Sequence, residues 1–413
     1  MAKNKINRRE FITECSLKLA GASVLLNQSG AKPAFGKEKK LQQKNNKEPY
    51  MEYRTLGRTG LKVSALGFGV MRVQEPAVLF KALEMGVNFF DTCGLARYAK
   101  KENMLGKVLK EYGRKKAYVT TKVYPMAQTP QRFPEDSEGE EPQQIKIHIP
   151  MMEKWLDEAL KRLQTDYVDV LYLHDIHDFS WQLNEDMIAF LGKIKKAGKA
   201  RFTGISFHEQ GRLFVEIIDA ALKIDYFDVF LAACNFKSPP EHIEALTRAH
   251  KKNVGVVAMK TQAGGYQQGA TGGFTPHQAA LKWVLDNSFV DCAIPGMVNR
   301  EQLEENAGAV GKKVGWHDRK VLSNYYAAVK DRLCLRCGGC SATCPLAVNI
   351  PAVHRSLMYW EGYQDFSLGR DSYQRLTASR NGLACVNCSA PTCRCVNGMK
   401  IPERMRQAHA VFA

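Results

Sequence analysis

Short apolar runs alternate with longer amphipathic stretches eight times along this chain of 413 residues, and this alternation constrains the fold more than any other feature. The runs are rich in β-branched and aromatic residues, as buried strands of a parallel sheet are. They span residues 63–69, 87–92, 117–123, 167–175, 200–206, 227–235, 254–260 and 290–296. Between them lie helical segments such as 153–164, with apolar residues at helical spacing. The pattern predicts an α/β fold of the TIM type, a closed (β/α)8 barrel.

An open, doubly wound sheet is the alternative for such a pattern. That fold favours a glycine-rich dinucleotide fingerprint after its first strand. The first run ends in "LGFGVM" (66–71), which supplies G-x-G without the third glycine. The closed barrel therefore explains the sequence better.

Polar side chains stand at the expected ends of six consecutive strands, from the second to the seventh. They are Asp91, Lys122, His174, Ser206, Asn235 and Lys260. Since the carboxyl ends of barrel strands open at one mouth, where the chemistry of such barrels takes place, we expect these side chains to share one site.

Six segments match one protein family in the same order. They are "YRTLGRTGLKVSALGFGVMR" (53–72), "GVNFFDT" (86–92), "VTTKV" (119–123), "DYVDVLYLH" (166–174), "GKARFTGIS" (198–206) and "IPGMVNREQLEENAGA" (294–309). Together they resemble the aldo/keto reductase superfamily over about residues 51 to 310. The resemblance implies an NAD(P)H-dependent oxidoreductase that reduces a small-molecule carbonyl, or oxidises an alcohol in reverse.

The resemblance also implies a catalytic group of four residues: Asp91, Tyr98, Lys122 and His174. Their chemistry is coherent. A phenol with a pKa near 10 is a reluctant proton donor at neutral pH. A neighbouring Lys ammonium would stabilise the phenolate left behind, and an Asp would keep that ammonium charged and oriented. A neutral His would hydrogen-bond the carbonyl oxygen and align the substrate.

Tyr98 departs from the family's spacing. The family places its Tyr five residues after the Asp, where this chain has Ala96. Downstream, Glu102 and "LGKVLK" (105–110) return to the family's register. A two-residue insertion before Tyr98 explains the difference.

Residues for a dinucleotide come from the same resemblance. Ser206 matches a serine that binds the nicotinamide carboxamide, and the loop 260–265, which begins at Lys260, would wrap the pyrophosphate. Gln302, Glu305 and Asn306 match contacts to the adenosine end. Arg300 would pair with a 2′-phosphate, which favours NADP(H) over NAD(H). Phe207, Leu231 and Met259 depart from the family at positions near the nicotinamide.

Eight of the 12 cysteines lie after residue 333. The first four, Cys334, Cys337, Cys340 and Cys344, form the C-x2-C-x2-C-x3-C-P run of bacterial ferredoxins. In that motif three thiolates hold one [4Fe-4S] cluster and the fourth ligates the other cluster. The run is highly specific, so the sequence predicts a ferredoxin-type domain with two clusters.

The second cysteine run, "CVNCSAPTCRC", is distorted. Cys385, Cys388 and Cys395 keep the spacing of the first, second and fourth ligands, but Pro391 stands at the third position and Cys393 follows two residues later. We expect cluster I to bind Cys334, Cys337, Cys340 and Cys395, and cluster II to bind Cys344, Cys385, Cys388 and Cys393. A structural zinc ion is the alternative for this half.

The N-terminus resembles a twin-arginine export signal. Arg8 and Arg9 precede Phe11 and Ile12 and a weakly apolar stretch. The alternative is a basic amphipathic helix that frays in solution. The first reading predicts an exported, periplasmic protein, and the second leaves it in the cytoplasm.

Net charge is +17, but residues 1–48 carry 11 Lys and Arg against 4 Glu, so much of the charge lies outside the barrel. No aromatic platform accompanies the other basic residues, which argues against nucleic-acid binding. No apolar run has the length of a transmembrane segment. The expected order is a signal segment (1–36), a linker (37–50), the barrel (51–330), the iron–sulfur domain (331–400) and a tail (401–413).

Three functions fit this combination. The barrel reduces a carbonyl while the clusters are structural or sense redox state; or the clusters exchange electrons with an external carrier; or the barrel is a non-catalytic scaffold for a ferredoxin-like module. A nicotinamide exchanges a hydride and a cubane a single electron, so direct exchange between them is chemically mismatched.

Overall fold

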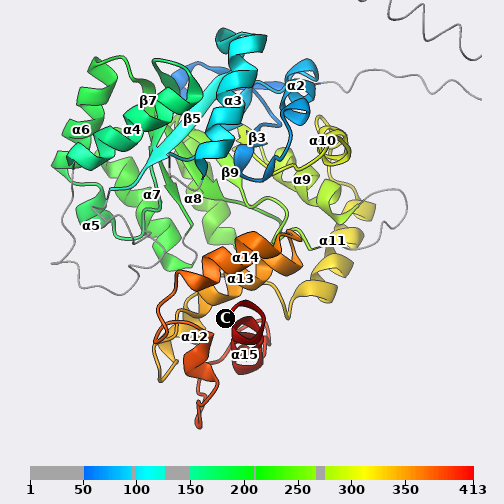
Figure 1. Ribbon diagram of the computed structural model, residues 1–413. Coiled ribbons are helices and arrows are strands. Elements are labelled where there is room, and N and C mark those ends of the chain that lie inside the picture. The colour runs from blue at the N-terminus through cyan, green and yellow to red at the C-terminus, as the bar shows by residue number, and fades with distance from the viewer. Residues whose placement is uncertain (1–50, 95–97, 126–148, 209–210, 267–274) are drawn as a thin grey trace, which may run out of the picture. The chain divides into compact units, whose positions relative to one another are not determined.

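The computed structural model describes residues 51–94, 98–125, 149–208, 211–266 and 275–413 (Figure 1). The expected signal segment and linker, residues 1–50, lie outside the described residues, and so does the proposed insertion ahead of Tyr98. Lys47–Ala413 form one compact unit. In the part of the chain that is described, no helix has the length and apolar character needed to cross a membrane.

Eight parallel strands form the central sheet, and the prediction of a barrel is confirmed. They are β3 (Phe68–Gly69), β4 (Phe89–Asp91), β5 (Tyr118–Val123), β6 (Val168–Leu173), β7 (Ala200–Phe207), β8 (Val229–Ala233), β9 (Gly255–Met259) and β10 (Cys292–Ala293). Each strand pairs with the next along the chain. Bridges from Leu66 to Ala293 and from Gly69 to Gly296 join the last strand to the first, so the sheet closes.

The first predicted strand, 63–69, is wrong as a single element. Its beginning belongs to an antiparallel hairpin of β1 (Tyr53–Thr55) and β2 (Lys62–Ser64), and only its end joins the barrel as β3. Leu56, Leu61 and Val63 of the hairpin pack with inward-facing strand residues such as Phe89. The hairpin therefore closes the barrel end where the strands begin, which an apolar run alone does not reveal.

Helices cover the outside of the sheet (Figure 1). They are α2 (Pro76–Glu84), α3 (Ala99–Tyr112), α4 (Ile149–Leu163), the short α5 (Phe179–Gln182), α6 (Glu185–Lys196), α7 (Arg212–Ile224), α8 (Pro240–Lys251), α9 (Pro276–Asp286) and α10 (Arg300–Ala307). Helix α4 confirms the segment predicted at 153–164, and its buried face includes Leu156, Leu160 and Leu163. This apolar layer between helices and strands is the main core.

Helix α11 (Trp316–Val329) packs on α9 through Val321 and Leu322 and through a buried ion pair between Lys282 and Asp318. The cysteine-rich part follows. Its helices are α12 (Gly339–Ala342), α13 (Ile350–Glu361), α14 (Phe366–Gln374) and α15 (Ile401–Phe412). Because Met405 and Phe412 of α15 are buried in the core of this part, residues 401–413 belong to it and are not a separate tail.

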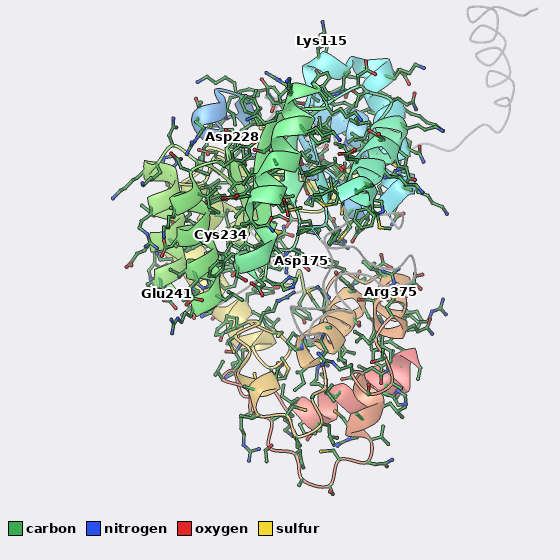
Figure 2. The ribbon with its side chains drawn as sticks, turned by 90° about the vertical axis from the view of Figure 1, so that its left-hand side faces the viewer. Lys115, Asp175, Asp228, Cys234, Glu241 and Arg375 are labelled. Carbon is green, nitrogen blue, oxygen red and sulfur yellow. The ribbon has the colours of Figure 1, made fainter. Side chains whose placement is uncertain are left out.

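The cysteine-rich part contacts the barrel at the ends of the strands. Arg72 donates from Nη2 to the carbonyl oxygen of Tyr363, at 2.6 Å, and its guanidinium lies 4.3 Å from the centre of the Tyr363 ring. In Figure 2, Asp228, just before β8, lies farther from the C-terminal helices than Cys234, just after β8. The carboxyl ends of the strands therefore face this part of the chain.

Candidate active site

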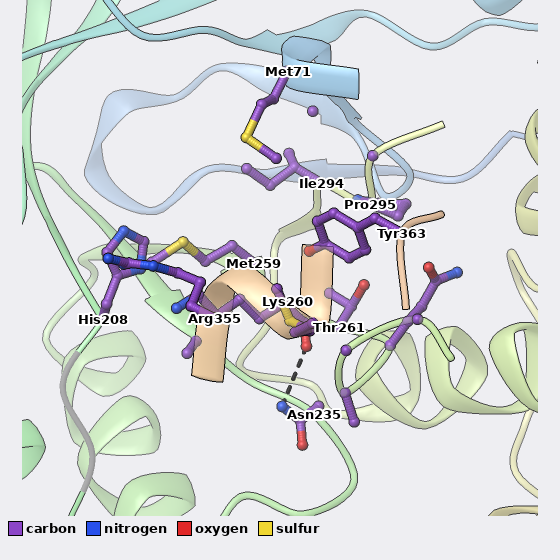
Figure 3. A pocket seen from close by; sticks show the side chains of 18 of the residues that line it. Met71, His208, Asn235, Met259, Lys260, Thr261, Ile294, Pro295, Arg355 and Tyr363 are labelled. Carbon is purple, nitrogen blue, oxygen red and sulfur yellow. Dashed lines mark hydrogen bonds between the residues drawn. The ribbon is translucent and has the colours of Figure 1, made fainter. Parts of the chain in front are cut away.

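A cavity of about 290 Å³ lies at the carboxyl ends of the barrel strands. Its wall includes all four predicted catalytic residues, Asp91, Tyr98, Lys122 and His174. The structure thus brings to one space four side chains that come from three strand ends and the start of α3. Figure 3 shows Met71, Met259 and Ile294 around the same cavity, so part of its lining is apolar.

Lys122 and Asp91 form a buried ion pair. Lys122 Nζ lies 2.6 Å from both carboxylate oxygens of Asp91 and 2.5 Å from the carbonyl oxygen of Thr92. Thr120 donates a further hydrogen bond to Asp91 Oδ1 at 2.7 Å. The pair forms because β4 and β5 are neighbours with Asp91 in register with Thr120. Burial makes such a pair strongly directional, because water does not compete for its hydrogen bonds.

Tyr98 occupies the N-cap position of α3, without a side-chain capping hydrogen bond, and is half-buried. Its hydroxyl donates to Met71 Sδ at 3.3 Å, and its ring packs beside Cys93 and Tyr124. A thioether is a weak acceptor, so a better acceptor entering the cavity can displace it. The phenol lines the same cavity as Lys122.

His174 follows β6 and is held from two sides. Its Nδ1 is hydrogen-bonded to Ser206 Oγ, which lies at the corresponding end of β7. The Tyr124 and His174 rings pack edge to face, with centroids 4.7 Å apart. A ligand in the cavity would therefore meet the opposite ring nitrogen, Nε2. Ser206 is fully buried beneath His174 and does not line the cavity, so its side chain orients the imidazole in this structure.

Glu102 is a buried support for the site that sequence reasoning treated only as a register marker. Its carboxylate accepts from Thr92 and Thr121, residues that adjoin Asp91 and Lys122, and it pairs with Arg162 at 2.7 Å. Burial raises the pKa of Glu102, and Arg162 with the two hydroxyls opposes that rise. An acidic residue on the apolar face of a predicted helix was the signal for this role.

Of the residues predicted for the dinucleotide, Lys260 lines the cavity, at the end of β9. Besides Ser206 on β7, the other four lie on α10, outside the cavity wall. Arg300 is exposed and pairs with Glu304, and Gln302 accepts from the backbone N–H of Val298. Glu305 is hydrogen-bonded to Thr275. Asn306 accepts from Gln262, which does line the cavity, so α10 supports this loop indirectly.

Residues of the cysteine-rich part complete the cavity, and sequence reasoning missed them. Leu333, Cys334 and Arg336 enter from the first cysteine loop, and further side chains enter from α13 and the turn after it. The latter are His354, Arg355, Met358, Tyr359 and Tyr363. The sequence places them outside the barrel, and no local pattern indicates that they fold back over its mouth.

Cys340 and Cys385 each lie near three other C-terminal cysteines, which gives two groups of four thiols. Burial and, to a smaller extent, the neighbouring thiols of Cys334, Cys395 and Cys337 together raise the pKa of Cys340 to about 11. Burial likewise raises the pKa of Cys385 to about 11, with contributions from Cys344, Cys393 and Cys388. Each group therefore consists of three cysteines from one run and one from the other.

A second, small cavity of about 20 Å³ is lined by all four thiols of the first group, Cys334, Cys337, Cys340 and Cys395. Backbone N–H groups of Arg336 and Asn397 donate to the sulfurs of Cys334 and Cys395, both at 3.4 Å. No disulfide joins the described cysteines. Nor do three or more His, Cys, Asp or Glu side chains of the described chain converge closely enough to hold a single metal ion.

The fold and the site together define a barrel oxidoreductase, and comparison with known proteins identifies the family. A family model for the aldo/keto reductase family matches residues 66–271. The L-galactose dehydrogenase of Arabidopsis thaliana is 31% identical over 296 residues, which cover 63% of this chain and 88% of that protein. The chain belongs to the aldo/keto reductase family, and it is an NAD(P)H-dependent oxidoreductase.

Two further similar proteins are both aldo-keto reductases by name. Aldo-keto reductase yakc of Schizosaccharomyces pombe, whose name specifies NADP(+), is 24% identical over 302 residues, 61% of this chain and 85% of that protein. An aldo-keto reductase from Klebsiella pneumoniae, solved in complex with NADPH, superposes with a TM-score of 0.52 at 20% identity. That match covers 67% of this chain and 95% of the solved one, and it supports the barrel fold.

Proposed function

We propose that the protein reduces a small-molecule carbonyl with NAD(P)H, or oxidises the corresponding alcohol, at the cavity over the barrel mouth. The observation that carries the proposal is the buried Lys122–Asp91 pair in the same cavity wall as Tyr98 and His174. A proton donor, a cation to tune it and a hydrogen-bond donor for the carbonyl oxygen are the groups that this reaction needs.

The side chains divide the work between them. Tyr98 gives its phenolic proton to the carbonyl oxygen of the substrate. Lys122, held in place by its ion pair with Asp91, stabilises the resulting phenolate, and Tyr98 recovers a proton from solvent. His174 donates from Nε2 to the same oxygen while Ser206 holds the other ring nitrogen. A bound NAD(P)H would supply the hydride to the carbonyl carbon.

We propose NADP(H) as the dinucleotide, with Lys260 and the loop that follows it near the pyrophosphate. The exposed guanidinium of Arg300 is suited to a 2′-phosphate, because a planar fork of donors matches phosphate oxygens. The NADP(+) in the name of the Schizosaccharomyces relative supports the same choice. A lower Kd for NADPH than for NADH, with the difference lost in Arg300→Ala, would support this choice, and equal affinities would contradict it.

The decisive variant is Tyr98→Phe, which removes the proton donor and keeps the ring. NADPH consumption with a panel of aldehydes and ketones should fall by about 10²- to 10⁴-fold, the usual contribution of a general acid. Tyr124→Phe is the matched control, because it removes a phenol beside His174 that has no part in proton transfer in this scheme. Unchanged turnover in Tyr98→Phe would exclude Tyr98 as the acid.

We also propose that the cysteine-rich part binds two [4Fe-4S] clusters. Cys334, Cys337, Cys340 and Cys395 would hold cluster I, and Cys344, Cys385, Cys388 and Cys393 would hold cluster II. The cavity lined by the first four thiols and the N–H groups directed at two of their sulfurs support this assignment. Each bound cluster would exchange single electrons, so an external electron carrier is the partner we propose for this part.

Cys334 lines both the small cavity and the cavity at the barrel mouth. This arrangement favours a redox role for cluster I over a purely structural one, because cluster I would lie beside the reaction site. The reduction potential of cluster I should therefore shift when a dinucleotide binds to the anaerobic protein, as EPR-monitored titration would measure. An unchanged potential would favour a structural role.

We propose export through the twin-arginine route, based on Arg8 and Arg9. This route carries folded proteins, so a dinucleotide and the clusters would be loaded beforehand. Replacing both arginines with lysine should retain the protein in the cytoplasm, as cell fractionation would measure. Mass spectrometry of the denatured, exported protein would reveal a carried dinucleotide, and finding none would refute preloading.

A further inference from the structure

The loop after β9, residues 260–266, lines the barrel-mouth cavity over its whole length. Its backbone is strained. Lys260 and Ala263 have φ of 55° and 46°, and Gly264 and Gly265 follow with φ of 90° and 63°. A non-glycine residue in this left-handed conformation persists only where surrounding contacts hold it. The shape of the loop therefore depends on the groups that pack against it.

The start of the cysteine-rich part holds one end of the loop. Tyr266 donates a hydrogen bond from its hydroxyl to the carbonyl oxygen of Arg332. Ala263 and Tyr266 are buried in one apolar cluster with Leu333. Cys334 follows Leu333 directly, so the loop packs on the segment that leads into the first cysteine run.

The turn after α13 packs on the middle of the loop. A Cβ atom added to Gly362 would collide with the carbonyl oxygen of Gly264, and one added to Gly265 would lie 3.5 Å from the ring of Tyr363. The two backbones therefore approach as closely as only glycine allows. Figure 3 shows Tyr363 on the same cavity wall as Lys260, the first residue of the loop.

Gly362 touches the loop without lining the cavity. It can therefore act on a ligand in the cavity only through the loop. Arg332, Leu333, Gly362 and Tyr363 all lie beyond residues 66–271, the segment that matches the family model. These contacts to the loop thus come from the cysteine-rich part of this chain.

We propose that the cysteine-rich part clamps loop 260–266 in the shape that binds the dinucleotide, and that Gly362 is a positioning residue for this loop. The inference rests on the proposed function, which places the pyrophosphate at the loop. A loop that is already held in its bound conformation pays less ordering cost when the ligand binds. NADP(H) therefore dissociates slowly and stays with the protein when free dinucleotide is removed.

The first measurement uses the anaerobically purified full-length protein loaded with NADPH. The native protein should retain NADPH through gel filtration, as nicotinamide absorbance would show. Stopped-flow fluorescence after addition of excess NADP+ then gives the rate at which NADPH dissociates. No carbonyl compound is present, so the result does not depend on the proposed activity. Loss of NADPH from the native protein during gel filtration would overturn the clamp and leave carbonyl reduction untouched.

Gly362→Ala tests the contact directly. Gly362 has φ of −90°, which alanine adopts readily, so the added methyl group conflicts with its neighbours and not with its own φ. The dissociation rate should rise by about 10- to 100-fold, the usual effect of overpacking a tight contact. Gly192→Ala in α6 is the matched control, because its added methyl group would lie 3.6 Å from the nearest atom, the Tyr226 hydroxyl. A native rate in Gly362→Ala, with iron content and circular dichroism retained, would overturn the proposal.

Hydrogen exchange without dinucleotide shows where Gly362→Ala acts. Exchange should become faster at residues 260–266 and stay unchanged in strands β5–β8. Faster exchange throughout the barrel would indicate general destabilisation and would overturn the positioning role.

Arg72→Ala is the second variant and covers the case in which Gly362→Ala does not fold. It releases the turn at Tyr363 from the barrel side and adds no group to the contact with the loop. NADPH should again dissociate faster than from the native protein. An unchanged rate in Arg72→Ala would overturn the proposal as well.

Discussion

The barrel and the cysteine-rich part are held together by different means. The barrel core is a continuous layer of aliphatic and aromatic side chains between helices and strands. The core of the other part is smaller and includes the thiols of Cys340, Cys385 and Cys393 beside residues such as Phe412. Hydrocarbon burial stabilises a large domain by itself, whereas a domain of about 80 residues commonly needs a metal or disulfides. We therefore expect the barrel to fold without its cofactor and the second part to depend on the two clusters that we propose for it.

The largest effect is expected from Cys337→Ser, which removes an exposed ligand of the proposed cluster I. Iron content should fall by about half and the broad visible absorption should weaken, because one of two clusters is lost. Limited proteolysis should then cut the cysteine-rich part and spare the barrel. Cys234→Ser is the control, since that buried thiol lies in the barrel core. Retained iron in Cys337→Ser would refute the ligand assignment.

Glu102→Ala should cost the barrel about 3–5 kcal/mol in free energy of unfolding, because it leaves Arg162 without its buried partner. Urea unfolding followed by far-UV circular dichroism measures the loss. Arg58→Ala breaks the exposed pair with Asp225 and should cost less than about 1 kcal/mol. Iron content should stay the same in both. Equal losses would show that burial does not distinguish the two ion pairs.

Arg72→Ala should loosen the contact between the two parts by about 1–3 kcal/mol, because it removes a hydrogen bond to Tyr363 and the stacked guanidinium. Hydrogen exchange should become faster at the end of α13 and remain unchanged in strands β5–β8. Arg72→Lys keeps the charge but lacks the planar guanidinium. Its hydrogen-exchange rate at the end of α13 should therefore lie between those of the native protein and of Arg72→Ala. Unchanged exchange in Arg72→Ala would mean that other contacts hold the two parts together.

The last prediction concerns pH. Burial raises the pKa of Asp291, before β10, to about 7, while the N–H of Val256 and the charge of Arg54 oppose the rise. Between about pH 4 and pH 7 the folded chain holds this proton more tightly than the unfolded chain, so stability from this group falls as pH rises through that window. The slope is at most about 1.4 kcal/mol per pH unit.

Asp291→Asn cannot titrate, and its amide oxygen can still accept from Val256. The variant should therefore gain stability relative to the native protein between pH 5 and pH 7.5, as urea midpoints at both pH values would measure. Parallel curves for the two proteins would contradict the raised pKa.

Much of the barrel could be read from the sequence because most strand residues are buried, so apolar side chains predominate in most of the strands. The same regularity predicted that Asp91, Lys122 and His174 would meet. The hairpin at 53–64 was missed, because an apolar run does not show whether its residues enter the barrel or close its end. Ser206 was assigned to the cofactor, and its contact with His174 depends on side-chain orientation, which spacing does not reveal.

Local sequence was sufficient where the interacting groups are neighbours in the chain or lie at equivalent positions of repeated units. That is true of the barrel strands and of the residues at their ends, since hydrophobic period is a short-range property. Only the tertiary structure decided that Arg336, Arg355 and Tyr363 face the barrel mouth. Their placement depends on how two separately packed parts contact each other, and that contact joins residues far apart in the chain through side-chain shape and charge.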